Sequence, residues 1–470
     1  MKRGPIRLLL LLALAGGCAS GPPAPEEGPR LRSGPMRGYA ELTEAAIWVQ
    51  TTAPAEVRLR YWPVGREGAA RVSDPAPATA ASHRTALVVV SSLAPGTRYA
   101  YEVLLDSGPP LREPHWVFAT QPLWQYRAAP PDFTVALGSC YWLDDPAVDR
   151  PGRKPAHSTA IFDRIAEKRP DLMLWLGDNV YYRETDFGSA AALRERNARG
   201  REEPRLQKLL ASASHYAIWD DHDFGPNNAV WTYRRAPDAE EAFRLYWANP
   251  QYGAPGIRGI FGQFPWADVD FFLLDDRTYR TAETAADSAG RRMLGPDQLR
   301  WLKDALLASE APFKIVAIGS QVLNRRARVD TLRLYPAEYR GLIDFLVANR
   351  VRGVVFVTGD KHHAELIRDT PPAFYTLYDF TSSPLTAEMW LDDGEEENPD
   401  RVDGTLVLDQ PNFGLLRVTG PCKDRVLTME TWDATGALRW RHAVRAEDLI
   451  PPGEKPGEGR GHPGCRWLKS

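Results

Sequence analysis

The sequence is poor in several residue types, and each shortage narrows the class of protein. Only four of its 470 residues are cysteine, which excludes a small disulfide-rich scaffold. The net charge is −3, so we expect no general attraction to nucleic acid and no nucleic-acid-binding module. Aromatic residues are plentiful, with 15 Trp, 17 Tyr and 16 Phe, and this argues against a disordered chain. The sequence therefore predicts a globular protein large enough for two or three domains.

Long apolar runs are also missing, except at the N-terminus. Basic residues precede the apolar run 8–14, and small residues then lead to Cys18. The run is too short to span a membrane, and the pattern is typical of a secretory signal. Its ending at a cysteine is similar to a bacterial lipobox, so we expect residues 1–18 to be a lipoprotein signal peptide and Cys18 to be lipidated. The alternative is an ordinary signal peptide that is cut nearby.

This signal predicts where the protein resides. We expect export from a bacterial cell, with a lipid anchor in the cell envelope (outer membrane or periplasm), or secretion. Membrane contact would then come through the anchor only. The same compartment is oxidising, which allows a disulfide between Cys422 and Cys465, although the sequence leaves this pairing open. Cys140 would then remain unpaired.

The rest of the chain divides by its pattern of elements. Residues 19–35 are rich in Pro and Gly and predict a flexible tether. Residues 36–122 contain short strand-like segments, and the stretch around Tyr99 resembles the fibronectin type III signature, so we expect a β-sandwich. From residue 131 to 446 strands alternate with helices, which predicts an α/β domain. Residues 447–470 form a C-terminal tail, and we expect this tail and the acidic segment Asp392–Asp400 to be solvated.

The α/β part has clear helix and strand signals. Proline early in a segment of good helix formers marks several helix starts, and Pro204 should interrupt one long helical segment. The predicted helices are Ser158–Lys168, Ala190–Ala211, Ala239–Trp247, Pro296–Leu307 and Pro336–Ala348. The predicted strands are Phe133–Gly138, Asp171–Gly177, Val269–Asp275, Phe313–Gly319, Val354–Thr358 and an antiparallel pair, Phe413–Val418 and Arg425–Trp432.

Three apolar runs end abruptly in carboxylate or imidazole side chains. The runs lead to Gly177–Tyr181, to Trp219–Asp223 and to Gly359–His363. The carboxyl ends of parallel strands meet at one edge of a sheet, so we expect these side chains to form a single site. Carboxylate, imidazole and thiolate groups are metal ligands, and Cys140 follows the first strand of the same domain.

Five motifs in this order carry a resemblance to a known family. They are Gly138–Cys140, Gly177–Tyr181, Trp219–Asp223, Leu274–Arg280 and Gly359–His362. Together they resemble the alkaline phosphatase D (PhoD-like) family of calcineurin-like, purple acid phosphatase-type metallophosphatases. The resemblance implies a four-layer α/β/β/α metallophosphatase sandwich that follows an N-terminal fibronectin type III-like β-sandwich.

The resemblance also implies a set of metal ligands. Asp178 is expected to bridge two metals, and Tyr181 to bind ferric iron as a phenolate. The remaining implied ligands are Cys140 and His362 for the iron, and Asp221, Asn227 and Asp360 for the other ion or ions. The implied metals are Fe³⁺ and Ca²⁺, and the alternative is a dinuclear Zn, Mn or Mg site. Asn228 remains an alternative to Asn227.

Three further residues are candidates for catalysis or substrate binding. His222 is expected to donate a proton or a hydrogen bond to the leaving oxygen, and Arg277 to clamp phosphate. Gln321 at the end of another strand is a candidate substrate contact. Each has a purely structural alternative: His222 as a partner of a nearby Asp, and Arg277 as an ion-pair partner of Asp275.

The predicted function is a metal-dependent phosphoester hydrolase, of the alkaline phosphatase or phosphodiesterase type, that uses a metal-bound hydroxide. One alternative is a diesterase of the phospholipase D kind or one acting on a cell-wall phosphate polymer. An alternative of another class is a non-catalytic surface lipoprotein. The expected partner is a phosphate ester substrate, and the expected state is a monomer.

Overall fold

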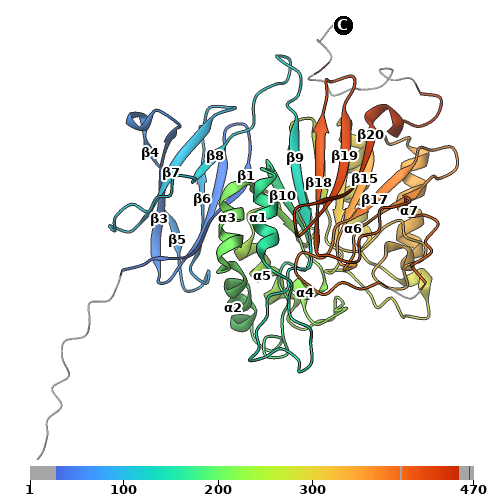
Figure 1. Cartoon of the computed structure of the whole chain (residues 1–470), viewed down its shortest axis with the longest axis horizontal. Coiled ribbons are helices and arrows are strands. Elements are labelled where there is room, and N and C mark those ends of the chain that lie inside the picture. Colours follow the sequence, from blue (N-terminus) through green and yellow to red (C-terminus); the bar gives the residue numbers. More distant parts are fainter. Residues whose placement is uncertain (1–27, 392–393, 455–464, 466–470) are drawn as a thin grey trace, which may run out of the picture.

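The computed structural model describes residues 28–391, 394–454 and 465 (Figure 1). The predicted signal peptide with Cys18, most of the tether and most of the tail therefore lie outside the described residues. None of the helices in the described ranges has both the length and the apolar character needed to cross a membrane. The described chain forms an N-terminal β-sandwich followed by a larger α/β domain.

The N-terminal β-sandwich has two antiparallel sheets, of strand order β1-β2-β6 and β4-β3-β7-β8, and β5 pairs with β3. Strand β1 begins at Leu31, so residues 31–35 belong to the sandwich and not to the tether, a correction to the predicted boundary. The hydroxyl of Tyr99 accepts a hydrogen bond from the backbone N–H of Ala94 at 2.8 Å, which anchors the corner before β7. The elements are β1 (Leu31–Ala40), β2 (Ala45–Thr51), β3 (Ala55–Pro63), η1 (Glu67–Ala69), β4 (Arg71–Val72), β5 (Ala76–Ala78), β6 (Thr85–Val90), β7 (Arg98–Leu105) and β8 (Val117–Ala119).

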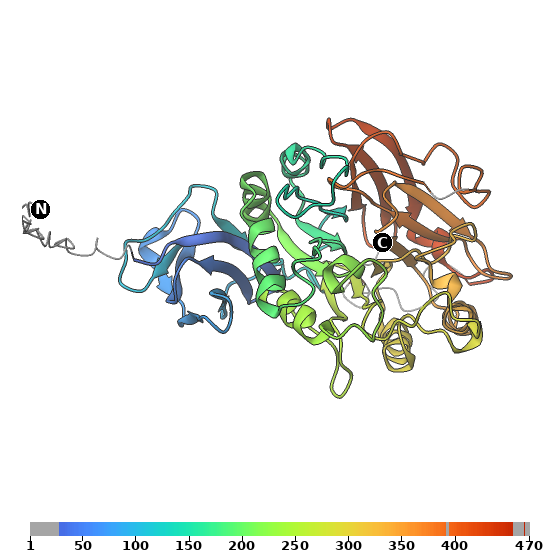
Figure 2. The same ribbon diagram turned by 90° about the horizontal axis from the view of Figure 1, so that it is seen from below.

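The sandwich is held firmly against the α/β domain. The indole N–H of Trp48 donates to the backbone oxygen of Leu245 at 2.7 Å, and the Gln50 amide donates to the Tyr246 hydroxyl at 2.9 Å. Both donors lie on β2, and both acceptors lie at the end of one helix of the α/β domain. In Figure 2 the sandwich forms one end of an elongated molecule.

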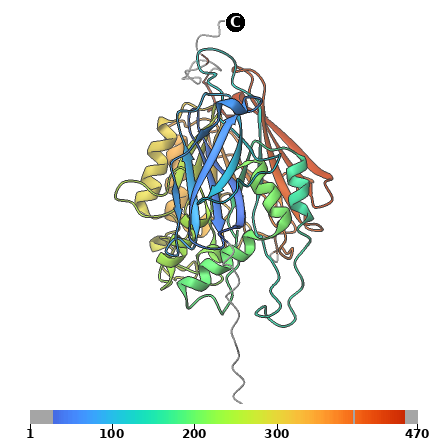
Figure 3. The same cartoon turned by 90° about the vertical axis from the view of Figure 1, so that its left-hand side faces the viewer.

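The α/β domain contains two six-stranded sheets, of strand order β11-β10-β9-β18-β19-β20 and β12-β13-β14-β15-β17-β16. Helices α1 (Ala160–Glu167), α2 (Ala190–Arg201) and α3 (Pro204–Ser212) lie on one side of the pair of sheets, and α6 (Pro296–Ala308) and α7 (Pro336–Ala348) on the other (Figure 3). This arrangement confirms the predicted four-layer α/β/β/α sandwich. The strands are β9 (Phe133–Gly138), β10 (Leu172–Leu176), β11 (Ser214–Ile218), β12 (Gly262–Trp266), β13 (Val269–Leu273), β14 (Lys314–Ile318), β15 (Val354–Thr358), β16 (Glu365–Asp369), β17 (Leu377–Thr381), β18 (Asn412–Thr419), β19 (Val426–Asp433) and β20 (Leu438–Arg445).

Helices α2, α6 and α7 start where the sequence predicts them, whereas α1 starts two residues after the predicted Ser158 and α5 (Ala236–Tyr246) three residues before the predicted Ala239. Pro204, Pro296 and Pro336 each occupy the first turn of a helix, where the missing N–H has no intrahelical partner to lose. The predicted interruption at Pro204 is confirmed, because α2 ends before it and α3 begins at it. The helices are α1 (Ala160–Glu167), α2 (Ala190–Arg201), α3 (Pro204–Ser212), α4 (Asp221–Phe224), α5 (Ala236–Tyr246), η2 (Ser288–Gly290), α6 (Pro296–Ala308), η3 (Leu332–Leu334), α7 (Pro336–Ala348) and η4 (Ala446–Leu449).

The strands that carry the predicted site are parallel and buried. Strands β9, β10 and β11 run parallel in the first sheet, and β13, β14, β15 and β17 in the second. All five residues of β10 and of β15 are buried, as expected for parallel strands covered on both faces. Their carboxyl ends lie along one edge of the domain, and the loops that follow them build the site.

Two C-terminal features can be compared with the predictions, namely the disulfide and the acidic segment. Cys422 and Cys465 form a disulfide, with Cα atoms 6.0 Å apart, which confirms that pairing. The acidic segment is solvated only in part, because residues 394, 396, 397 and 399 are exposed whereas the residues between them are not. Glu395, Asn398 and Asp400 are buried, and the Arg401 guanidinium donates to the backbone oxygens of residues 395 and 396.

Candidate metal centre

The residues at the strand ends share an unusual backbone conformation. Cys140, Asp178, Asp360 and His362 all have positive φ, between 52° and 61°. Side chains other than glycine rarely adopt this left-handed region, and such strain gathers at functional sites. Gly359 is needed beside them, because a Cβ atom there would lie 2.4 Å from the backbone oxygen of Leu176. The close approach of β10 and β15 thus brings their ligand-type side chains together.

The first group of side chains contains sulfur, oxygen and nitrogen donors. Ligand atoms of Cys140, Asp178 and His362 all lie within 4.8 Å of one another. The Tyr181 hydroxyl is 3.3 Å from Nε2 of His362. Nδ1 of His362 bonds the backbone oxygen of Glu388, which leaves Nε2 facing Tyr181 and able to bind a metal.

A second group adjoins the first and shares one residue with it. Ligand atoms of Asp178, Asp221 and His222 lie within 4.8 Å of one another, and so do those of Asp220, Asp221 and Asp360. Asp178 therefore belongs to both groups, the position expected of a carboxylate that bridges two metals. Asn227 and Asn228 both line the adjoining cavity, and the backbone N–H of Asn228 donates to Asp221 at 2.6 Å.

We use the name pocket cluster for the six side chains that converge here: Cys140, Asp178, Tyr181, Asp221, Asp360 and His362. Burial raises the pKa of Asp178, and the negative charge of Asp221 raises it further. Burial likewise raises the pKa of the Cys140 thiol to about 12 and lowers that of His362 to about 4. The largest cause of all three shifts is burial, which disfavours the charged form of each group.

The pocket cluster fits bound cations. Oδ1 of Asp221 and Oδ2 of Asp360 are buried, and neither has a hydrogen-bond partner among the described residues. No basic side chain lies within 4.0 Å of the carboxylates of Asp178, Asp221 or Asp360 in the same ranges. Buried carboxylates in excess of their partners need a positive charge. Thiolate, phenolate and imidazole suit iron or zinc, and carboxylate oxygens suit harder ions such as calcium.

A cavity of about 500 Å³ opens over the pocket cluster. Every member of the cluster except Cys140 lines it, together with His222, and that volume is within the range of small-molecule sites. The ring of His222 packs against that of Tyr181, with centroids 4.2 Å apart and the ring planes inclined by 34°. Burial lowers the pKa of His222, although Asp221 opposes this shift. The ring therefore lines the cavity beside the candidate metal ligands.

Two of the predicted substrate contacts do not reach this cavity. The Arg277 side chain is fully buried, and its Nε donates to Asp220 at 2.5 Å. Asp330 accepts from the same guanidinium at 3.2 Å. Gln321 is also fully buried and donates to Glu365 and Thr381. The structure thus gives both residues internal partners, and neither lines the large cavity, so their roles as substrate contacts stay predictions.

A second set of charged groups lies behind the pocket cluster, and we call it the back cluster: Lys361, His363, Glu365, Glu395 and Arg401. Ligand-type atoms of three members, His363, Glu365 and Glu395, lie within 4.8 Å of one another. Its carboxylates have basic partners, because Arg401 bonds Glu365 at 2.6 Å and Lys361 lies 3.8 Å from Glu395. Each carboxylate of the back cluster thus has a basic side chain within 4.0 Å, which the carboxylates of the pocket cluster lack among the described residues.

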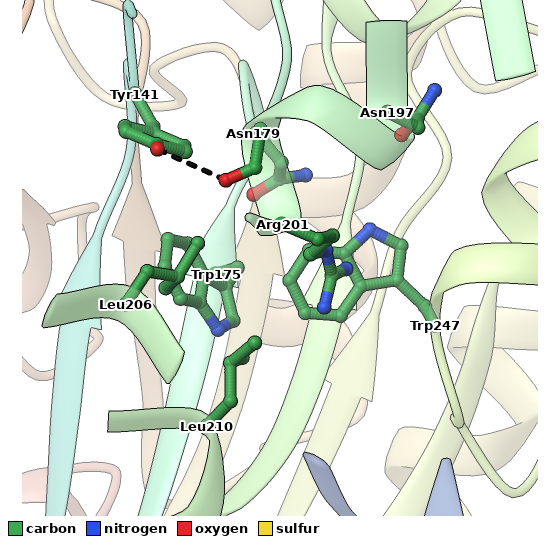
Figure 4. Close-up of a pocket in the computed structure, with 9 residues that line it drawn as sticks. Tyr141, Trp175, Asn179, Asn197, Arg201, Leu206, Leu210 and Trp247 are labelled. Carbon is green, nitrogen blue, oxygen red and sulfur yellow. Dashed lines mark hydrogen bonds between the residues drawn. The ribbon is translucent and has the colours of Figure 1, made fainter. Parts of the chain in front are cut away.

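A smaller cavity lies beside the end of β10 (Figure 4). It is lined by Trp175, Arg201 and Trp247, among others, and Tyr141 bonds the backbone oxygen of Gly200 at its edge. Its volume of about 10 Å³ has room for roughly one water molecule. No substrate of the predicted kind fits there.

Sequence reasoning missed several residues that line the large cavity. Trp142, Arg153 and Trp390 belong to none of the sequence motifs, and the loops that carry them bring them to the site. The available signal was the position of the loop that carries Arg150 and Arg153, directly after the first strand of the α/β domain. Loops at the carboxyl ends of parallel strands often carry function.

Comparison with solved structures gives the class of the protein. A structure of PhoD covers 89% of this chain and 92% of its own, with a TM-score of 0.69 and 17% identity. Purple acid phosphatase PPD1 from yellow lupin (Lupinus luteus) seeds covers 89% of this chain and 74% of its own, with a TM-score of 0.65 and 11% identity. At such identities these matches show the fold, which is that of the metallophosphatases.

Within that class, the chain belongs to the PhoD-like phosphatase family, whose model matches residues 152–423. A second model, described as a domain of unknown function (DUF7800), matches residues 28–122, the N-terminal β-sandwich. Alkaline phosphatase D of Bacillus subtilis (strain 168) is 22% identical over 281 residues. That match covers 49% of this chain and 46% of the relative, so the chain matches less than half of the curated relative.

Proposed function

We propose that this protein hydrolyses phosphate esters at a metal centre formed by the pocket cluster. The observation that carries the proposal is the convergence of four ligand-type residues in left-handed backbone conformations, with Asp178 shared between two groups of donors. Membership of the PhoD-like phosphatase family supports the same reaction class. The substrate would be a phosphomonoester or a phosphodiester.

We propose that Fe³⁺ is held by Cys140, Tyr181 and His362. Calcium would be held by Asp221, Asp360 and Asn227 or Asn228, and Asp178 would contact both ions. The alternative is a dinuclear Zn, Mn or Mg site. When bound, such cations acidify water and neutralise charge on phosphoryl oxygens.

The chain's own groups have distinct tasks in this proposal. His222 lines the cavity next to Asp221, and in this proposal it would give a proton to the leaving oxygen or bond it. The bond from His362 to the Glu388 backbone oxygen fixes which ring nitrogen faces the cluster. The buried carboxylates concentrate negative charge that favours cation binding.

The proposal is tested by metal analysis, a visible absorption spectrum and hydrolysis of aryl phosphate monoesters and diesters. We expect iron and calcium, a phenolate-to-iron band, and turnover of at least one ester class. Tyr181→Phe should abolish the band. Tyr182→Phe is the matched control, since the Tyr182 hydroxyl bonds Asn197 instead and the residue does not belong to the pocket cluster. A purified protein that binds no metal and hydrolyses neither ester would contradict the proposal.

A further inference from the structure

The loop between β9 and α1 carries Trp142 and Arg153 to the wall of the large cavity. Asp144 holds this loop together, because its carboxylate accepts from the Trp142 indole at 3.0 Å and from the backbone N–H of Ala156 at 2.9 Å. The backbone N–H of His157 then bonds the Thr386 oxygen at 2.8 Å. Both ends of the loop are thus fixed relative to the pocket cluster.

The Trp142 ring is covered by two guanidinium groups. The central carbon of Arg153 lies 3.3 Å from the ring centroid, and that of Arg183 lies 3.5 Å from it. Two groups this near one centroid cannot share a face, so they stack on opposite faces of the indole. Trp142 also packs edge-on against Tyr181, with centroids 5.0 Å apart. Arg153 is therefore held at a defined place beside the candidate metal ligands.

The three arginines that line the cavity differ in their partners. Arg183 bonds Asp149 at 2.7 Å and the Leu143 oxygen at 2.8 Å, so its donors are occupied. Arg150 bonds Glu184 at 2.6 Å. Arg153, in contrast, has no carboxylate within 4.0 Å and no side-chain hydrogen bond in the described part of the chain. Its fork of N–H donors is open to a ligand in the cavity.

The charge of Arg153 acts at the reaction site. Arg153 lines the same cavity as His222 and His362. An anion in the cavity would thus lie within the field of this guanidinium. Planar guanidinium groups match the geometry of phosphoryl oxygens.

We propose that Arg153, stacked on Trp142, binds the phosphoryl oxygens of the substrate and so takes the role that the sequence suggested for Arg277. This inference rests on the proposed phosphoesterase function, and it names a substrate-binding residue for it. Arg153 would add its hydrogen bonds on the side of the phosphoryl group that the metal ligands leave open.

The test compares Arg153→Gln, Arg153→Lys and the matched control Arg150→Gln, all as full-length metal-loaded protein. We expect kcat/KM on an aryl phosphate to fall about 10- to 100-fold in Arg153→Gln, because a charge-assisted bidentate contact is lost. Arg153→Lys should fall between, since it keeps the charge without the fork. Arg150→Gln should change kcat/KM less than about twofold, because an exposed ion pair contributes little.

A binding measurement separates substrate contact from a structural role. The inhibition constant of inorganic phosphate should rise most in Arg153→Gln, less in Arg153→Lys and least in Arg150→Gln. The metal content and the visible spectrum should stay at wild-type values in all three. Three outcomes would each overturn the inference. Arg153→Gln could leave kcat/KM and phosphate inhibition unchanged, Arg150→Gln could lose as much activity as Arg153→Gln, or Arg153→Gln could lose its metal. A wild-type protein without esterase activity would instead refute the proposed function.

Discussion

His362 and His363 are adjacent in the chain, but they belong to two clusters of opposite character. His362 lies in the pocket cluster, whose buried carboxylates have no basic partner within 4.0 Å among the described residues. His363 lies in the back cluster, where Arg401 and Lys361 balance Glu365 and Glu395. Both clusters are buried and rich in metal-type ligands. Both clusters contain residue types that can bind metals, so residue type does not distinguish them. Buried carboxylates without basic partners do, and they mark the candidate functional site.

The largest expected effect comes from the residue shared by both ligand groups. Asp178→Asn should lower kcat/KM at least about 1000-fold, because removal of a ligand to both cations removes transition-state charge stabilisation. It should not lower the melting temperature of the metal-free protein, since it removes a repelling buried charge. Steady-state kinetics and calorimetry measure the two effects. Asp163→Asn on α1, outside both clusters, is the control, and a metal-free Asp178→Asn protein that melts well below wild type would contradict the charge argument.

The opposite outcome is expected for the back cluster. Arg401→Met leaves Glu365 buried without its 2.6 Å partner, which should destabilise the protein by about 3–5 kcal/mol. The metal content and kcat/KM of the folded fraction should change little. Urea unfolding and elemental analysis measure both. The double variant Arg401→Met/Glu365→Gln should recover much of the loss, and a drop in bound metal equal to that of Asp178→Asn would show that the two clusters are one site.

Removal of metal should affect only the pocket cluster. Treatment with a chelator should abolish activity and reduce the free energy of unfolding by about 4 kcal/mol when the metal had been present at a thousand times its dissociation constant. Asp178→Asn should show a smaller difference between metal-loaded and metal-free forms. Thermal unfolding with and without added metal measures this. A chelator effect on stability that is the same in wild type and Asp178→Asn would place the stabilising cation elsewhere.

The sequence was sufficient for the fold because its signals are local. Apolar runs such as β15 and proline-started helices such as α7 occupy the ranges predicted for them. Strand-end motifs also predicted that Cys140, Asp178 and His362 would meet, since parallel strands gather their carboxyl ends. Each of these features is determined either by neighbouring residues in the chain or by the rule that parallel strands end at one edge of a sheet.

The partners of charged side chains could not be predicted in the same way. Arg277 follows a strand end, as a phosphate clamp would, but Asp220 lies 57 residues away in the chain and neutralises it inside the protein. Arg153 carries no motif, and only the folded loop shows that it lacks a carboxylate while Arg150 has one. The pairing of charged side chains depends on contacts between segments that are distant in the chain, and a single sequence does not show these contacts.

The smallest expected effect uses pH to compare the clusters. Burial alone would raise the pKa of Glu365, but His363 and Arg401 lower it from 4.5 to about 2. Folding therefore favours the ionised carboxylate, so its stabilisation is complete above about pH 4.5 and is lost as the pH falls towards 2. Glu365→Gln should remove this part of the acid dependence, about 3 kcal/mol across that window. Asp178 contributes with the opposite sign, because its pKa is raised in the metal-free protein. Urea unfolding of metal-free wild type and Glu365→Gln between pH 2 and 6 measures the difference, and parallel curves for the two proteins would show that Glu365 is not held ionised by the back cluster.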